Sequence, residues 1–148
     1  MTLFFPDINV WLALSVSSHA HSEGAWTWLE ALSPQAGVIL SRYTQLGLLR
    51  LLTNPAAMGE QVLTIRKAWI VYERWLKDPR VEFYAESGNF DISFREAMAP
   101  LDSKPASKWV GDCYLLAYAR ESNAVLVTYD RALLEYADRH GFRAVAPA

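Results

Sequence analysis

The segment Ala124-Val125-Leu126-Val127-Thr128-Tyr129-Asp130 contains the clearest strand of the sequence and ends in an aspartate. A short apolar, valine-rich run without polar alternation is typical of a strand covered on both faces of a parallel sheet. We therefore predict a strand over residues 124–128. A helix over residues 131–140 should follow it, with Gly141 as its C-terminal stop, and then a last strand over residues 142–145.

The rest of the chain continues this alternation of strands and helices. Short apolar runs predict earlier strands over residues 2–5, 37–40 and 81–84. The spacing of apolar residues, together with capping residues such as Ser41, predicts helices over residues 7–15, 21–32, 42–52, 60–77, 90–99 and 107–122. Such alternation implies an α/β fold, a three-layer α/β/α sandwich with a mainly parallel central sheet.

Length and composition predict a single domain over residues 1–148. About half of the residues (52%) are hydrophobic, which is enough for one continuous core at this length. The net charge of -2 argues against a protein that coats nucleic acid non-specifically. The lone Cys113 excludes an intrachain disulfide, and no apolar run suits a signal peptide or a membrane span. We therefore expect a soluble, cytoplasmic protein with no membrane partner.

Three aspartates are the candidate catalytic and metal-binding residues. Asp7 and Asp130 each follow an apolar strand, and ligands of open parallel sheets bind beyond the carboxyl ends of the strands. Asp112 lies in the first turns of the 107–122 helix, where we expect it to face a partly buried surface. Converging carboxylates repel one another, and an all-oxygen ligand set favours Mg²⁺ or Mn²⁺. This chemistry suits hydrolysis of a phosphodiester.

Each aspartate also has a purely structural interpretation. Asp7 and Asp130 are suitable N-cap residues for the helices that follow them. Asp112 has the favourable position of an acidic residue in the first turn of a helix. Taken together, two aspartates at strand ends and one inward-facing helix aspartate still favour a site for chemistry.

The sequence resembles the PIN-domain nucleases and, among them, the VapC-type toxins of bacterial toxin–antitoxin pairs. A loop with His19 and His21 before a tryptophan-bearing helix adds to the likeness. The segments that carry the resemblance are Phe5-Pro6-Asp7-Ile8-Asn9-Val10-Trp11-Leu12, Thr44-Gln45-Leu46-Gly47-Leu48-Leu49-Arg50-Leu51-Leu52-Thr53-Asn54-Pro55, Trp109-Val110-Gly111-Asp112-Cys113-Tyr114-Leu115 and Leu126-Val127-Thr128-Tyr129-Asp130.

The resemblance implies a Mg²⁺- or Mn²⁺-dependent endoribonuclease that forms a homodimer. It also implies RNA as the substrate and a small cognate antitoxin, which binds DNA, as the inhibitor in a type II toxin–antitoxin pair. The acidic residues of the family correspond here to Asp7, Asp112 and Asp130. Many members carry a glutamate in the third helix where this chain has Gln45, which leaves three carboxylates rather than four and questions a second metal site.

Four further residues are candidates for supporting or substrate-positioning roles. Asn9 could hydrogen-bond a ligating carboxylate, or serve as an ordinary polar residue of a first helical turn. Thr128, on the same strand face as Asp130, could orient a carboxylate or satisfy the strand end. Gln45 could hydrogen-bond a metal-bound water. Arg50 could contact an RNA phosphate, although a solvated or ion-paired arginine is the commoner role.

Two other functions compete with the endoribonuclease toxin. A catalytically weak PIN-like module could bind RNA or a protein without cutting, and Gln45 is the feature that favours it. A phospho-receiver signalling domain also gathers acids at the carboxyl edge of a sheet. The receiver requires a lysine at the end of a late strand, and the last predicted strand has none.

Overall fold

The protein, described by a computed structural model of residues 1–148, has five parallel strands in one sheet. Their order across the sheet is β3-β2-β1-β4-β5, so that the first strand of the chain is the central one. The strands are β1 (Leu3–Pro6), β2 (Gly37–Leu40), β3 (Val81–Phe83), β4 (Ala124–Val127) and β5 (Ala144–Val145). The sequence prediction of a mainly parallel α/β sheet is confirmed.

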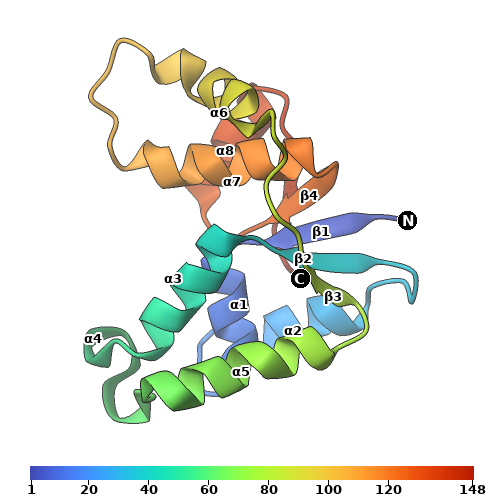
Figure 1. The fold of residues 1–148 in the computed structure, drawn as a ribbon, viewed down its shortest axis with the longest axis vertical. Helices are drawn as coiled ribbons and strands as arrows, with labels where there is room; N and C mark the ends of the chain where they lie inside the picture. Colours follow the sequence, from blue (N-terminus) through green and yellow to red (C-terminus); the bar gives the residue numbers. More distant parts are fainter.

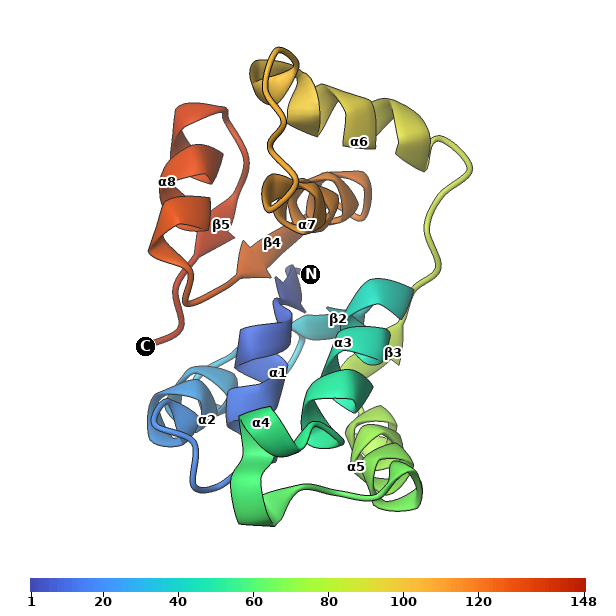
Figure 2. The ribbon, with the colours of Figure 1, turned by 90° about the vertical axis from the view of Figure 1, so that its left-hand side faces the viewer.

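Helices cover both faces of the sheet, as Figures 1 and 2 show. The first group is α1 (Ile8–Ser15), α2 (Ser22–Glu30), α3 (Arg42–Leu52), α4 (Pro55–Met58) and α5 (Ile65–Lys77). The second group is α6 (Phe90–Met98), α7 (Trp109–Glu121) and α8 (Arg131–Arg139). Short 3-10 turns, η1 (Gly59–Gln61) and η2 (Ala99–Leu101), complete the structure. No helix is long and apolar enough to cross a membrane.

Two hydrophobic clusters fill the spaces between the sheet and its helices. Successive strand residues point to opposite faces, so Phe5 of β1 is buried among α7 and α8 residues while Phe4 packs against the cluster of α1 and α2. The middle of α7 is buried on all sides, from Cys113 to Ala119. This burial on all sides makes α7 a fixed support for Asp112, near its N-terminus.

The helix predicted over residues 60–77 begins later than expected, at Ile65. Gly59 has a positive φ of 56°, and Val62 is extended, which interrupts the helical path. Thr64 then caps the helix by accepting a hydrogen bond from the Lys67 N–H. The apolar residues before Thr64 fit a helical period, but their backbone does not continue it.

Strand pairing brings an early and a late segment of the chain together at the carboxyl ends of the strands. In the register of β1 and β4, Pro6 is the partner of Val127. The Asp7 N–H then donates to the Val127 carbonyl at 2.8 Å. Asp7 and Thr128 therefore leave their strands side by side at the carboxyl edge, where a ligand site of a parallel sheet is expected.

Candidate acidic site

Asp7 is a buried carboxylate with several hydrogen-bond donors. Its side chain is only 7% exposed. Oδ1 accepts from the Ile8 N–H at 2.6 Å, so Asp7 caps α1, as its structural interpretation predicts. Oδ2 accepts from the Thr128 hydroxyl at 2.8 Å and from the Asn9 amide at 3.3 Å. Burial raises the pKa of Asp7, and the nearby Asp130 raises it further, while these donors act against the shift.

Thr128 joins Asp7 to Asp130. Its fully buried hydroxyl donates to Asp7 and accepts from the Asp130 N–H at 3.1 Å. Asp130 Oδ1 accepts from the Leu133 N–H at 3.1 Å and caps α8. Asn9 fixes the same turn, since its amide oxygen accepts from the Tyr129 N–H at 3.4 Å. Asn9 and Thr128 thus lie in direct contact with the acids, and their roles in a functional site stay a prediction.

Asp112 reaches the same edge of the sheet from the first turn of α7. Burial raises its pKa to about 6, and the negative charges of Asp130 and Asp7 contribute to the rise, against the positive charge of Lys108. The interaction between two charges weakens with the distance between them and with the solvent around them. The charges of Asp7 and Asp130 therefore act on Asp112, although the three aspartates come from three separate elements.

No cation of the chain neutralises this cluster by direct contact. The one salt bridge of the molecule joins Arg80 to Asp78, far along the chain from all three acids. The side chains also do not form a ready cage, since no three acidic, imidazole or thiol groups are arranged to hold an ion. One buried and two partly buried carboxylates that repel one another are nevertheless the kind of oxygen donor set that suits Mg²⁺ or Mn²⁺.

Gln45 and Arg50 lie on different faces of α3. Gln45 is buried, and its Oε1 accepts a hydrogen bond from Arg42 at 2.6 Å. Its hydrogen bonds do not reach the three aspartates. Arg50 is exposed and lines a hollow of about 260 Å³ with Ile8, Gly47 and neighbouring residues. Arg50 is therefore on the side of α3 that faces α1 and the acidic edge.

Tyr43 is a residue of this site that the sequence reasoning missed. Its pKa is raised by burial and by the negative charges of Asp7 and Asp112, and lowered in part by Arg50. Its hydroxyl lies against Gly111, since a Cβ atom built there would be 2.3 Å from the phenolic oxygen. A glycine directly before the helix aspartate was the one signal in the sequence for such a close approach.

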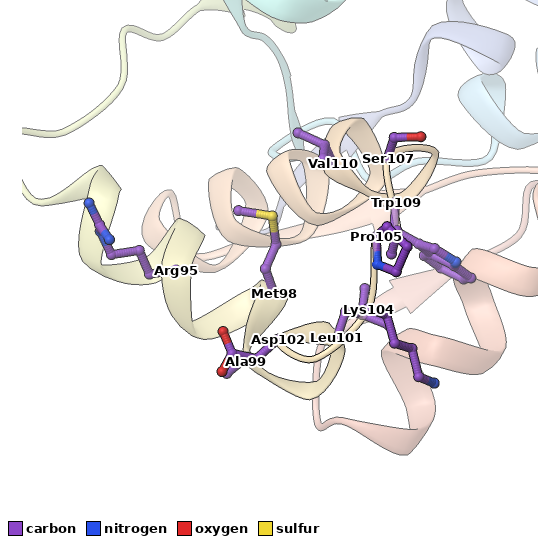
Figure 3. Close-up of a pocket in the computed structure, with 11 residues that line it drawn as sticks. Arg95, Met98, Ala99, Leu101, Asp102, Lys104, Pro105, Ser107, Trp109 and Val110 are labelled. Atoms are coloured by element: carbon purple, nitrogen blue, oxygen red, sulfur yellow. The ribbon is translucent and has the colours of Figure 1, made fainter.

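A hollow of about 670 Å³ lies between the end of α6 and the start of α7 (Figure 3). Its walls are partly apolar, with Met98, Leu101, Trp109 and Val110, and partly charged, with Arg95, Asp102 and Lys104. None of the three site aspartates lines it. The hollow is therefore not part of the acidic site.

Known proteins with similar sequences and folds point to one family. The PIN domain family matches residues 4–139 of the chain. Ribonuclease VapC41 of Mycobacterium tuberculosis is 37% identical over 134 residues, which cover 88% of this chain and 90% of that protein.

Two solved structures share the fold at low sequence identity. The VapBC2 complex of Rickettsia felis, bound to a promoter DNA fragment, aligns with a TM-score of 0.74 at 14% identity over 99% of this chain and all of that chain. Mycobacterium tuberculosis VapC20, a toxin that cleaves the sarcin-ricin loop, aligns with a TM-score of 0.65 at 16% identity over 89% and 93% of the two chains. Together with the family match and the acidic edge of the sheet, these likenesses show that the chain belongs to the PIN-domain family.

Proposed function

We propose that the chain is a divalent-metal-dependent endoribonuclease, the toxin of a type II toxin–antitoxin pair. The observation that supports the proposal is the pair Asp7 and Asp130, which Thr128 joins by hydrogen bonds at the carboxyl edge of the sheet, together with the effect of their charges on the pKa of Asp112. The relationship to ribonuclease VapC41 over most of both chains supports RNA as the substrate. Membership of the PIN family removes the support for a phospho-receiver domain.

Asp7, Asp112 and Asp130 would hold the Mg²⁺ or Mn²⁺ ion. A bound ion would neutralise charge that builds up on the scissile phosphate and make the attacking water more acidic. Asp7 is held in place by Thr128 and Asn9, so it is the most rigid of the three oxygen ligands. Asp112 is less buried, and its pKa of about 6 is raised by burial and by the charges of Asp130 and Asp7. A bound cation would lower that pKa and keep all three carboxylates ionised.

We place the protein with two macromolecular partners besides RNA. Solved relatives of this fold are VapBC and FitAB complexes of toxin with antitoxin, which supports a cognate antitoxin here. A homodimer is the second proposed assembly. Exposed apolar side chains on α5, among them Ile65, Trp69 and Ile70, and the exposed Trp26 of α2 support protein interfaces on this side of the molecule.

The decisive test is cleavage of a labelled single-stranded RNA by the wild-type protein and by Asp7→Asn. We expect cleavage with Mg²⁺ or Mn²⁺, none with EDTA, and a loss of roughly 100-fold or more in the variant. Asp112→Asn and Asp130→Asn should behave alike. Asp138→Asn, at an exposed position of α8, is the matched control and should retain wild-type activity.

The outcomes separate the proposed functions. Full activity of Asp7→Asn, or cleavage that survives EDTA, would remove the metal-dependent mechanism. RNA binding without any cleavage by the wild-type protein would support the catalytically weak PIN module instead. The neutral Gln45, whose side-chain oxygen accepts a hydrogen bond from Arg42, is the feature that supports that second function.

A further inference from the structure

Tyr43 stands in the first turn of α3, where the chain leaves the carboxyl end of β2. Its ring packs against Tyr114 of α7, with 4.8 Å between ring centroids, and its side chain is 36% exposed. The hydroxyl end of the ring therefore bridges from α3 to α7 and still faces solvent. It meets α7 at Gly111, the residue before Asp112.

Gly111 is required for this approach. A Cβ atom at position 111 would lie 2.3 Å from the phenolic oxygen and 3.3 Å from the ring carbon that carries it, so any other residue would displace the hydroxyl. Glycine is otherwise a poor residue inside a helix. Glycine at position 111 thus lowers the stability of α7 but leaves room for the Tyr43 hydroxyl beside the residue that precedes Asp112.

The proton of the Tyr43 hydroxyl is free, because the hydroxyl forms no hydrogen bond within the protein. The neighbouring donors are already engaged: the Thr128 hydroxyl and the Asn9 amide both donate to Asp7. Ionised carboxylates can only accept hydrogen bonds. At the acidic edge, Tyr43 therefore supplies a neutral donor for a ligand that carries oxygen acceptors.

We infer that Tyr43 is a substrate-contacting residue: its phenol donates a hydrogen bond to a non-bridging oxygen of the RNA phosphate that lies at the three aspartates. The inference rests on the proposed function, since it takes RNA as the ligand of the site. No bond is formed or broken by the phenol. Its hydrogen bond helps to offset the negative charge of the phosphate where the carboxylates would repel it.

The first experiment compares Tyr43→Phe with the wild-type protein and with Tyr84→Phe. Tyr84 is the control because it is half-buried and lines a separate hollow with Met1 and Pro34. We expect Tyr43→Phe to lower the cleavage rate at saturating RNA by about 10-fold or more, the effect of one hydrogen bond to a charged group. Its melting temperature should stay unchanged, because the phenyl ring keeps the packing against Tyr114. A wild-type cleavage rate for Tyr43→Phe would overturn the inference.

The second experiment uses Gly111→Ala alone and combined with Tyr43→Phe. Alanine should displace the hydroxyl and reproduce the loss of activity, although its helix propensity is higher. In the Tyr43→Phe background the hydroxyl is already gone, so the same alanine should cause little further loss. An effect of the alanine that does not act through the hydroxyl would instead give losses that multiply, since independent effects add in free energy. A purely structural role of the contact would lower the melting temperature of the single variants along with their activity.

Binding separates a failure of this inference from a failure of the proposed function. Fluorescence anisotropy with a labelled single-stranded RNA, in Ca²⁺ in place of Mg²⁺, should show about three- to tenfold weaker binding by Tyr43→Phe than by the wild type. If the wild-type protein does not cleave RNA but this difference in binding remains, the proposed ribonuclease function is contradicted and the Tyr43 contact is supported. Equal binding of the two proteins would contradict the contact whether or not RNA is cut.

Discussion

Asp112 carries a cost that depends on pH. Its folded-state pKa of about 6 lies above the usual value of 3.8, so the folded protein holds this proton more tightly than the unfolded chain. Protonation of Asp112 therefore stabilises the folded protein relative to its ionised form. This contribution is fully present below the usual pKa and is lost as the pH rises through about 6. We therefore expect the free energy of unfolding of metal-free Asp112→Asn to equal that of the wild type near pH 4 and to be higher by about 1 kcal/mol near pH 7. The difference is limited to this size because solvent screens the charge of a half-exposed group.

Thermal unfolding in EDTA between pH 4 and pH 8 measures this effect. A difference of about 1 kcal/mol corresponds to roughly 2 to 4 °C for a domain of this size. Asp138→Asn, which removes an exposed carboxylate of α8, serves as the control variant. A constant difference between Asp112→Asn and the wild type across this range would contradict the raised pKa.

Asp130 allows capping to be separated from chemistry. Asparagine can accept the hydrogen bond from the Leu133 N–H as aspartate does, whereas alanine cannot. Asp130→Asn should therefore keep the melting temperature and lose RNA cleavage. Asp130→Ala should lose both, with a destabilisation of about 1 kcal/mol. If Asp130→Asn retained full cleavage, Asp130 would be a helix cap alone.

Individual site residues differ in how well the sequence predicts them. Asp7, Thr128 and Asp130 could be predicted because they come at the ends of strands. Residues that directly follow parallel strands lie at the same carboxyl edge of the sheet. Whether Tyr43 or Gln45 faces the acidic edge depends on how α3 is rotated about its axis. They are two residues apart, which is about 200° around a helix, so one faces the acids while the other is held by Arg42. The sequence did not show which face of α3 meets the acidic edge.

The start of α3 is fixed by a buried capping box. Ser41 is fully buried and accepts from the Thr44 N–H at 3.2 Å, while the Thr44 hydroxyl accepts from the Ser41 N–H at 3.0 Å. We expect Ser41→Ala to lower the free energy of unfolding by about 1 to 2 kcal/mol, and Thr64→Ala, at the exposed cap of α5, to lower it less. Urea unfolding of both variants tests the order, and a larger loss for Thr64→Ala would contradict it.

Whole elements were predicted well where a cap and an apolar period agree. For α3 the predicted helix of residues 42–52 has the observed bounds. The strand of residues 37–40 is also observed as predicted. The predicted start of α5 was wrong because Gly59–Gln61 form a 3-10 turn and Val62 leaves the helical conformation after it. Part of its predicted apolar face, including Ile65 and Trp69, is exposed in the chain alone, since an apolar stripe does not say whether it meets the core or a partner.

Across the whole molecule, the acidic edge should couple metal binding to stability. An ion that binds only the folded protein raises the melting temperature with its concentration. We expect Mg²⁺ or Mn²⁺ at millimolar concentration to stabilise the wild type by several degrees, and EDTA to reverse the effect. Asp7→Asn should respond much less. An equal response of the two proteins would place the bound ion elsewhere.

The order of strands in the sheet lies beyond what the sequence patterns give. Alternation of strands and helices predicts a parallel sheet, but it leaves open which strand is central. The pairing of β1 with both β2 and β4 decides this, and it depends on packing of two hydrophobic clusters rather than on any local signal. The three-layer fold was therefore predictable, and its strand order was not.

The central position of β1 has a consequence for the cell that makes this protein. Asp7 and Thr128 are bonded to each other across 121 positions of the chain, and such distant contacts form late because a long loop must close first. A nascent polypeptide that still lacks β4 can pair β1 only with β2, so Asp7 has neither Thr128 nor Asp130 beside it. The acidic site therefore cannot assemble during synthesis until the segment that contains residues 124–130 has left the ribosome, and shorter products of interrupted translation should lack ribonuclease activity.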